Sequence, residues 1–536
     1  MKRRSTGTRV PRKHGAPLIR SGSTQIGTSG RKLSGNPGFH LGASCQIGLK
    51  CGGKNPSAPF ITKLGTRFWL RSVLGCPTAP AIDLAVWVDI LLPMIHVRVF
   101  AVILGRLLVA ITAAGWVSSV RADWPEFRGP TGDGYAPAPG KSKTAGYPLH
   151  WSDTENVQWK TPIPGRGWST PAILGGQVWL TTATEDGHDF FVIGLDAKTG
   201  QVKFNEKVFH SDNPEPLGNG ASMNCYATPS PVLEAGRVYV HFGAFGTACL
   251  DTSNGKVLWQ RTDLPCRHYR GPSSSPVSFE NLLILTFDGA DLQYVVALDK
   301  KTGRTVWKTD RSAQWNDENV PGQMARDGDL RKAHSTPLIV TGSGKPQMLS
   351  VGAKAAYSYD PRTGHEIWKV NHPDFSVAPR PVYRDGIAYL VTGQGKREMW
   401  AVKTDGTGDV TDTAVVWKLK KSIGKYASPL LIDGLIYTAS DESFVTCLDS
   451  ATGAIVWTER VGGKFAASPL YADGRIYLFD QQGTTLVLKP GRTYETIATN
   501  SLPAGFMASP AADGKAFYLR TRTHVYRVED GAAEKK

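Results

Sequence analysis

The chain has 536 residues, a formal net charge of +16 at pH 7 and a balanced content of apolar and charged residues (41% and 20%). The excess positive charge lies near the beginning of the chain. Residues 1–93 contain 14 Lys and Arg against two Asp, whereas residues 123–536 carry a net charge of only +1. A near-neutral body has no long-range attraction for phosphate backbones, so the charge distribution argues against nucleic acid as a partner.

Residues 1–93 are rich in Gly, Ser, Lys and Arg and show no sustained hydrophobic periodicity before the apolar piece at residues 79–92. Such a segment cannot bury enough apolar surface to fold alone. Three interpretations stay open: a disordered basic tail, an unusually long leader, or translated sequence upstream of the true start. The third is favoured because a conventional export signal begins at Met94.

Residues 94–122 have the parts of a signal peptide. A short basic region precedes the apolar residues 107–117, and Ala122 offers a small residue for cleavage. The alternative is a membrane anchor, but Arg106 shortens the apolar run below the roughly 20 residues that span a bilayer. We therefore expect cleavage after Ala122 and a periplasmic or otherwise exported protein without a transmembrane span.

Residues 123–155 follow the expected cleavage site and are rich in Gly and Pro, which excludes a regular element. Trp124 and Phe127 nevertheless need an apolar surface to pack on. We expect an N-terminal strap that lies against the following domain. The alternative, a strap that lines a ligand site, stays open.

From residue 156 to residue 529 the chain repeats one unit, whose clearest copy is residues 427–457. Two apolar runs flank Asp433 and Gly434, which predicts a β-hairpin with a type I′ turn, because both turn residues then adopt positive φ. Residues 444–448 and 454–457 supply a third and a fourth strand. Eight units are anchored on prolines 40 to 61 residues apart: Pro171, Pro231, Pro276, Pro337, Pro381, Pro429, Pro469 and Pro510.

Isolated four-stranded sheets would expose both faces, so the eight units are expected to pack face to face around a ring. The sequence predicts an all-β, eight-bladed β-propeller of four-stranded antiparallel blades, followed by a disordered tail at residues 530–536. The last unit ends with a third strand at residues 524–528. Residues 156–160, which include Trp159, can supply its fourth strand, so we predict a monomeric propeller closed by this N-terminal strand.

Residues 297–307, ALDKKTGRTVW, resemble the tryptophan-docking repeat of the pyrroloquinoline quinone (PQQ) propeller superfamily, and the resemblance extends over residues 156–528. In this motif the Asp accepts hydrogen bonds from turn amides, the Gly supplies positive φ and the Trp packs between neighbouring sheets. We therefore expect structural roles for Trp159, Trp259, Trp307, Trp368, Trp417 and Trp457.

The superfamily includes both quinone-dependent dehydrogenases and non-catalytic scaffolds, such as the propeller of the outer-membrane β-barrel assembly machinery, and fold alone does not choose between them. The dehydrogenase resemblance implies PQQ stacked on a disulfide of adjacent cysteines, with Ca²⁺ or a lanthanide held by carboxylates. The sequence contains no Cys-Cys pair and no C-x-x-C-H motif. We predict a non-enzymatic ligand-binding or assembly scaffold of the cell envelope, with no cofactor, metal or catalytic residue. A divergent PQQ-dependent alcohol or sugar oxidoreductase that uses Ca²⁺ is the alternative.

Four cysteines follow the expected cleavage site. Cys249 and Cys447 occupy equivalent third-strand positions and are interpreted as inert core thiols. Cys225 and Cys266 lie in loops that lead into inner strands. A disulfide between these two is compatible with an exported protein, and two unpaired thiols are the alternative.

The inner strands of all blades run in the same sense, so the segments that enter them converge on one end of the central channel. Cationic and aromatic residues in these segments suit an anionic or planar ligand, or an acidic peptide. The alternative is that these residues only fill this end of the channel and bind no ligand. Two long connectors, residues 209–224 and 312–332, are the expected specificity elements. The acidic residues of the second connector suggest a hard-cation site or, as favoured here, a solvated insert. The candidate ligand-binding residues are Arg166, Trp168, Tyr226, His268, Arg270, His334, Arg380, Lys425, Tyr426, Lys464 and Phe465.

Overall fold

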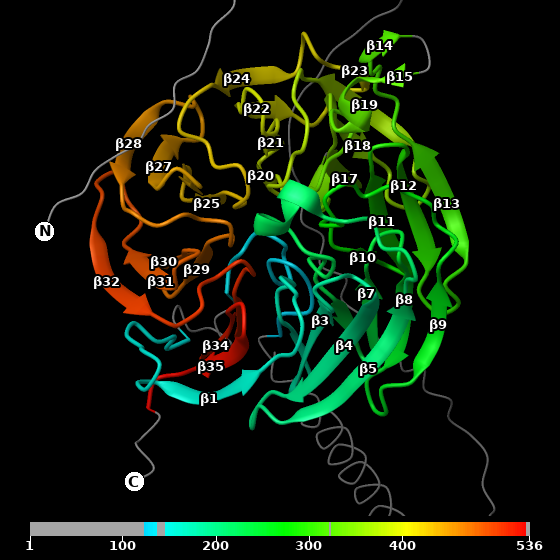
Figure 1. The fold of residues 1–536 in the computed structure, drawn as a ribbon. Helices are drawn as coiled ribbons and strands as arrows, with labels where there is room; N and C mark the ends of the chain where they lie inside the picture. The colour runs from blue at the N-terminus through cyan, green and yellow to red at the C-terminus, as the bar shows by residue number, and fades with distance from the viewer. Residues whose placement is uncertain (1–122, 137–144, 321–322, 343, 532–536) are drawn as a thin grey trace, which may run out of the picture. The chain divides into compact units, whose positions relative to one another are not determined.

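Eight antiparallel sheets form a ring in the computed structural model, which describes residues 123–136, 145–320, 323–342 and 344–531 (Figure 1). The predicted all-β, eight-bladed propeller is confirmed. The interpretations placed on residues 1–122 and 532–536 lie outside the described residues.

The first four blades run from an inner to an outer strand in chain order. Their strands are β2 (Ala172–Leu174), β3 (Gln177–Ala183), β4 (Asp189–Asp196) and β5 (Val202–His210); β6 (Val232–Glu234), β7 (Arg237–His241), β8 (Thr247–Asp251) and β9 (Val257–Arg261); β10 (Val277–Phe279), β11 (Leu282–Asp288), β12 (Gln293–Asp299) and β13 (Thr305–Asp310); β16 (Leu338–Gly342), β17 (Lys345–Val351), β18 (Ala355–Tyr359) and β19 (Glu366–Asn371).

The remaining blades follow the same plan, and every inner strand begins directly after its anchor proline. Their strands are β20 (Val382–Arg384), β21 (Ile387–Val391), β22 (Met399–Lys403) and β24 (Val415–Leu419); β25 (Leu430–Ile432), β26 (Leu435–Ala439), β27 (Phe444–Asp449) and β28 (Ile455–Arg460); β29 (Leu470–Ala472), β30 (Arg475–Phe479), β31 (Thr484–Leu488) and β32 (Thr496–Ser501); and β33 (Ala511–Asp513), β34 (Ala516–Arg520) and β35 (His524–Val528).

The eighth blade combines both ends of the propeller. β1 (Val157–Pro162) pairs antiparallel with β35, with Trp159 opposite Arg527, and the sheet order is β1-β35-β34-β33. Backbone hydrogen bonds between β1 and β35 therefore hold the first and last strands of the propeller in one sheet.

The fourth blade has an additional short strand. β23 (Gly408–Asp409), from the loop between β22 and β24, pairs in parallel with β19. The longer loop accounts for the irregular repeat that precedes Trp417.

At the outer rim, tryptophans dock on the turn of the next blade. The Trp259 indole N–H donates to the Lys300 carbonyl at 2.9 Å, and that of Trp368 donates to Thr404 at 3.3 Å. A Cβ atom on the turn glycine Gly303 would lie 2.6 Å from the Trp259 ring, so the indole leaves room only for glycine. Trp159, Trp307, Trp417 and Trp457 donate in the same way to the carbonyls of Ala197, Pro361, Ser450 and Gly491.

At the inner rim, hydroxyl groups join the blades. Each lies one residue before an anchor proline and accepts a hydrogen bond from the backbone N–H of the corresponding residue in the preceding blade, at 2.9 to 3.0 Å. The resulting hydroxyl girdle consists of Ser230, Ser275, Thr336, Ser428, Ser468 and Ser509. Arg380 occupies the corresponding position of the fifth blade and brings no hydroxyl, so the girdle is interrupted there.

The first part of the strap, residues 123–136, crosses the channel along the inner strands. Trp124 exchanges two backbone hydrogen bonds with Ile173 of β2, at 2.9 and 2.8 Å. The Leu233 N–H of β6 donates to the Pro125 carbonyl, and the Ala136 N–H donates to the Tyr471 carbonyl of β29, both at 2.8 Å. The strap therefore lies against blades on both sides of the ring.

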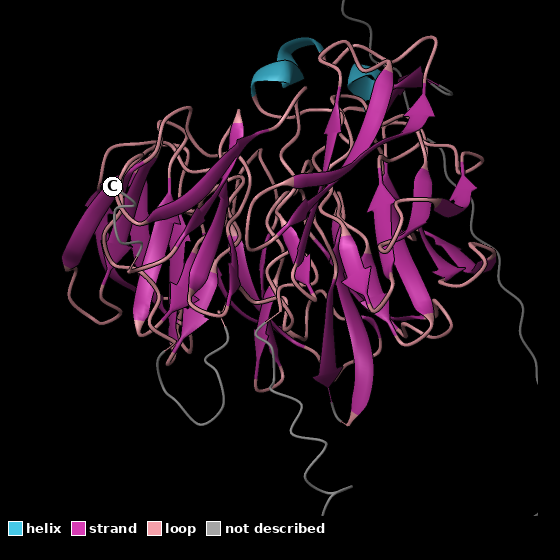
Figure 2. Cartoon of the chain, turned by 90° about the horizontal axis from the view of Figure 1, so that it is seen from below, coloured by secondary structure: helices cyan, strands magenta, loops and turns pink. Residues whose placement is uncertain are grey.

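The two connectors cover the other end of the channel. The first contains the 3₁₀ helix η1 (Gly218–Ser222), and the second contains β14 (Glu318–Val320), β15 (Gln323–Met324) and η2 (Ala325–Gly328). The short helical ribbons lie over the middle of the ring in Figure 1 and on one face in Figure 2. No helix among the described residues is long and apolar enough to span a bilayer.

Candidate functional site

A cavity of ≈ 970 Å³, its open mouth included, occupies the channel. Phe127 of the strap lines it, as do Gly220 and Met223 of the first connector and Lys332 of the second. The remaining wall consists largely of the segments that enter the inner strands. The site is therefore a blade-lined chamber to which the strap and both connectors contribute.

A salt-bridge cluster holds the two connectors together. The Arg267 guanidinium lies 2.8 Å from the Glu215 carboxylate of the first connector and 2.7 Å from the Asp327 carboxylate of the second. These contacts are partly exposed, so their individual contribution to stability is small. Together they fix the relative position of the two segments that border the site.

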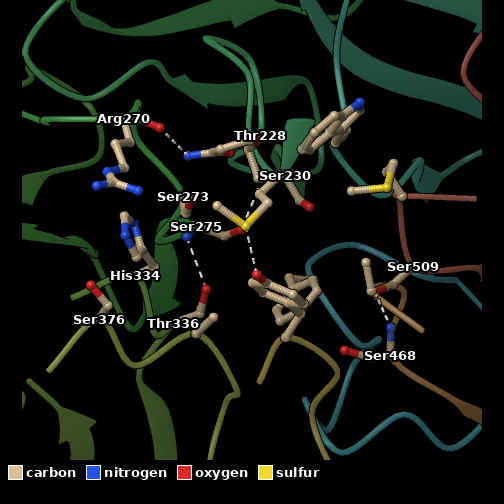
Figure 3. A pocket seen from close by; sticks show the side chains of 18 of the residues that line it. Thr228, Ser230, Arg270, Ser273, Ser275, His334, Thr336, Ser376, Ser468 and Ser509 are labelled. Carbon is tan, nitrogen blue, oxygen red and sulfur yellow. Dashed lines mark hydrogen bonds between the residues drawn. The ribbon is translucent and has the colours of Figure 1, made fainter. Parts of the chain in front are cut away.

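The segments before the third and fourth blades bring Arg270 and His334 together on one wall of the cavity, which Lys332 also lines (Figure 3). The buried Asp329 carboxylate lies 3.7 Å from the Arg270 guanidinium and also contacts the Lys332 ammonium group. Burial lowers the pKa of Lys332, and burial together with the nearby Lys332 lowers the pKa of His334 to about 3. His334 is therefore neutral near pH 7, and the two cations with one carboxylate leave a net positive charge on this wall.

The backbone at Arg270 is held in a strained conformation. Arg270 has φ = +77° and the following Gly271 has φ = +88°. The Asn224 side-chain amide, from the end of the first connector, donates to the carbonyls of both residues at 2.9 and 3.0 Å. Positive φ at a non-glycine residue costs about 1–3 kcal/mol and is retained where surrounding contacts impose it. Here those contacts place a guanidinium group on the cavity wall.

The other large side chains of the lining are mostly aromatic or contain thioethers. They are Trp168 of the first blade, Met507 of the eighth, Tyr426 of the sixth and Met223 of the first connector. The Tyr426 hydroxyl donates to the Met223 sulfur at 2.7 Å. The cavity thus combines a cationic wall with an apolar and aromatic one, from blades on different sides of the ring.

Of the eleven candidate ligand-binding residues, the structure places four in the cavity lining: Trp168, Arg270, His334 and Tyr426. Two others hold the first connector. Arg166 stacks over Trp168 at 5.1 Å and donates to the Ala221 carbonyl, and the Tyr226 hydroxyl donates to the Glu215 carbonyl at 2.9 Å.

Four further candidates lie away from the cavity lining. His268 packs against Phe287, with ring centroids 5.8 Å apart, and burial lowers its pKa to about 4. Lys425 pairs with Asp441 at 3.1 Å, Phe465 is buried in the core of the sixth and seventh blades, and the Lys464 side chain is exposed. The side chains of these four residues therefore do not contribute to the cavity lining.

Arg380 anchors the strap instead of lining the cavity. Its guanidinium donates to the Phe127 carbonyl at 2.7 Å and to the Pro337 carbonyl at 2.9 Å, and lies 3.5 Å from the Glu126 carboxylate. Both side chains are largely buried, and burial raises the pKa of Glu126. The Arg380 guanidinium therefore binds the strap within the folded protein.

Small hydroxyl residues were not among the predicted site residues, yet they form much of the lining. A signal for them existed, because Ser or Thr precedes the anchor proline in seven of the eight units. Its physical meaning depends on the contact with the next blade, which a single repeat does not show. The members that line the cavity are Thr170, Ser230, Ser275, Thr336, Ser468 and Ser509.

The cysteines near the channel are unpaired. Cys225 and Cys266 are both buried free thiols, so the structure contains two thiols where the sequence left a disulfide open. The Cys225 sulfur lies 3.2 Å from the Thr228 hydroxyl, and burial raises the pKa of this thiol. Cys249 and Cys447 are buried in the third strands β8 and β27.

The second connector uses its carboxylates for salt bridges. Asp317 pairs with Arg331 at 2.6 Å, while Asp327 and Asp329 pair with the cations named above. Within the described residues, no three His, Cys, Asp or Glu side chains are arranged to hold a metal ion. Among the described residues that line the cavity there is no Asp or Glu. Its cations suit the carboxylates of PQQ, but its residues do not fit the metal-assisted quinone site that the dehydrogenase resemblance implies.

The repeated blades, the docked tryptophans and the central chamber define a tryptophan-docked β-propeller of the PQQ-repeat class. A family model described as outer membrane protein assembly factor BamB matches residues 144–285, 291–428 and 409–532. The chain belongs to this family.

Curated relatives carry three different descriptions. A tetrathionate hydrolase of Acidithiobacillus ferrooxidans is 22% identical over 58% of this chain and 62% of its own length. The dehydrogenase subunit of a quinone alcohol dehydrogenase of Gluconobacter oxydans is 25% identical over 52% and 35%, and the assembly factor BamB of Yersinia pestis is 23% identical over 36% and 58%. The chain thus spans less than two thirds of the length of each of these relatives.

Among solved structures, a europium-containing methanol dehydrogenase superposes with a TM-score of 0.53 over 76% of this chain and 89% of its own, at 11% identity. This likeness concerns the fold alone.

Proposed function

We propose that the protein is an exported, non-enzymatic binding protein of the cell envelope that receives its ligand, or a segment of an envelope partner, in the central cavity. The observation that carries the proposal is the chamber bordered by the strap and the two connectors. Its wall offers hydrogen-bond donors, cations and aromatic surface, which are the components of a ligand site. Export is supported by the signal-peptide pattern of residues 94–122.

A PQQ-dependent oxidoreductase is the second candidate. It is favoured by the similarity to the quinone alcohol dehydrogenase subunit and by the cationic wall around Arg270. The described lining residues argue against it, because they include no Asp or Glu and a hard metal ion prefers carboxylate and carbonyl oxygens.

Reconstitution separates the two candidates. The purified full-length protein is incubated with PQQ and Ca²⁺, desalted, and tested for quinone absorbance and for dye-linked oxidation of ethanol and glucose. We expect no turnover. Stoichiometric retention of the quinone together with turnover would overturn the binding-protein proposal.

Blocking the cavity tests where binding takes place. Ala466 lines the cavity and is partly accessible, whereas Ala454 is exposed on a turn of the sixth blade. Molecules that co-purify with the protein are compared by native mass spectrometry for the wild type, Ala466→Trp and the matched control Ala454→Trp. We expect loss of bound material only in Ala466→Trp. Equal recovery from both variants would remove the cavity as the binding site.

A further inference from the structure

The contacts of the hydroxyl girdle determine whether its hydroxyl groups remain free to donate or to accept a further hydrogen bond. A hydroxyl group has one proton to donate and two lone pairs to accept with. Ser230, Ser275 and Thr336 each use a lone pair for the backbone N–H of the preceding blade, at 2.9 Å. Within the described part of the chain, these girdle hydroxyls and those of Ser468 and Ser509 donate to no protein acceptor. Their protons are therefore available to an acceptor in the cavity.

Thr170 adds a polar atom without a partner. Its side chain is 1% exposed and lines the cavity, and its hydroxyl oxygen has no hydrogen-bond partner among the described residues. A buried hydroxyl without a partner destabilises the folded protein, because it has lost its hydrogen bonds to water. A bound ligand that accepts a hydrogen bond here would remove that destabilisation.

The charged groups around the cavity also favour a ligand that accepts hydrogen bonds. Arg270 contacts Asp329 only at 3.7 Å, and its guanidinium donates no shorter hydrogen bond within the described residues. Its planar N–H groups thus remain available for an oxyanion. The Asp329 carboxylate is buried and is not part of the lining, so a ligand meets the cations and not the acid.

The apolar wall indicates that the ligand has an apolar part in addition to its anionic group. Trp168 and Met507 belong to one small buried cluster, and Met223 faces the cavity beside Tyr426. Thioethers and indoles make favourable contacts with flat or aliphatic groups. A bare inorganic ion would leave this surface unused.

From these contacts we infer that the cavity binds a small organic anion, with its oxyanion group held by Arg270, Lys332 and the hydroxyl girdle and its apolar body against Trp168, Met223 and Met507. The inference rests on the proposed function in one respect, namely that the cavity is the binding site. It adds the chemical class of the ligand.

Isothermal titration calorimetry of the full-length protein with four small molecules tests the chemical class of the ligand. Benzoate and phenyl phosphate combine an oxyanion with an apolar ring, inorganic phosphate has the anion alone, and benzyl alcohol has the ring alone. We expect one of the two aromatic anions to bind at least about tenfold more tightly than benzyl alcohol, which lacks the charged hydrogen-bond acceptor, and than inorganic phosphate, which lacks the apolar ring. The better aromatic anion identifies a carboxylate or a phosphate ligand.

Two variants assign the binding to the named atoms. Arg270→Gln is expected to weaken the better aromatic anion about tenfold or more and to leave benzyl alcohol unchanged. Thr170→Val removes a hydroxyl that has no protein partner, so it is expected to weaken the anion about threefold without lowering stability. The matched control is Arg304→Gln, which makes the same charge change on an exposed turn of the third blade.

The outcomes separate this inference from the proposed function. Equal affinity for benzoate, phenyl phosphate and benzyl alcohol would overturn the anion class and leave the cavity as a site for neutral ligands. If inorganic phosphate binds most tightly of the four probes, the inference that the ligand has an apolar part is wrong. An affinity that Arg270→Gln and Arg304→Gln change equally, or no binding of either aromatic anion, would overturn the inference as well. None of these results bears on the quinone turnover that would overturn the proposed function.

Discussion

Neighbouring blades are joined at two radii by contacts of different chemistry. At the outer rim a large indole covers a glycine turn and donates one hydrogen bond, as Trp259 does to Lys300 at 2.9 Å. At the inner rim a small hydroxyl accepts from a backbone N–H, as Ser275 does from Ser230 at 2.9 Å. The outer contact buries apolar area, whereas the inner contact leaves the channel open. The outer rim therefore contributes the apolar packing between blades, whereas the inner rim contributes hydrogen bonds and borders the cavity.

The largest effect is expected at the outer rim. Trp368 is 1% exposed and fills the space between the fourth and fifth blades, so Trp368→Ala should lower the free energy of unfolding by about 3–5 kcal/mol. Urea unfolding of the variant measures this change. Trp368→Phe keeps part of the packing and should lose less; equal losses would show that ring packing does not dominate.

A comparable effect is expected where the girdle is interrupted. Arg380→Met leaves the largely buried Glu126 carboxylate of the strap without its cation, which should cost about 3–5 kcal/mol. Combining it with Glu126→Gln should recover part of the loss in urea unfolding. A double variant as unstable as the sum of both single variants would contradict a coupled pair.

A smaller effect is expected within the girdle. Ser468→Ala removes the acceptor of the Ser428 backbone N–H, now bonded at 3.0 Å, and should cost about 1–3 kcal/mol of unfolding free energy. Ser468→Thr retains the hydroxyl and serves as the control. If the alanine variant unfolds at the same urea concentration as the wild type, the girdle does not stabilise the ring.

Between the two rims, buried histidines make stability depend on pH. Burial lowers the pKa of His241 to about 3 and that of His372 to about 4. The unfolded chain takes up these protons near pH 6.5, so stability is full above that pH and decreases as pH falls toward 4, by about 1.4 kcal/mol per pH unit for each histidine. His241→Asn should reduce the slope between pH 6 and 5 by that amount. An unchanged slope would contradict the assignment.

The smallest effect is expected at Lys464, which has the repeat position of a channel residue but an exposed side chain. Lys464→Glu should change the free energy of unfolding by less than about 0.5 kcal/mol and leave benzoate binding unchanged. Titration and urea unfolding check both expectations. Weaker benzoate binding in this variant would extend the cationic site beyond Arg270 and Lys332.

The outer rim could be read from the sequence because its contacts recur. The anchor prolines marked the eight units, and in the structure each inner strand begins at the residue after its proline. Asp433 and Gly434 both have the positive φ that the predicted type I′ turn requires. The site was predicted less well. Arg380 and Arg270 occupy similar positions before an inner strand, yet the strap takes the first, and Asn224 holds the second at the cavity. Whether an arginine at this position binds the strap or lines the cavity depends on non-repeating segments that fold back from elsewhere in the chain.

The strap also sets an order of assembly. The Tyr135 hydroxyl donates to the Leu431 carbonyl, 296 residues further along the chain, and β1 must await β35. Contacts between such distant residues form late, because a long loop has to close before they can form. The earliest part of the propeller to be synthesised is therefore among the last to reach its place, and until the final blade is complete the growing chain remains an open row of sheets with unpaired edges.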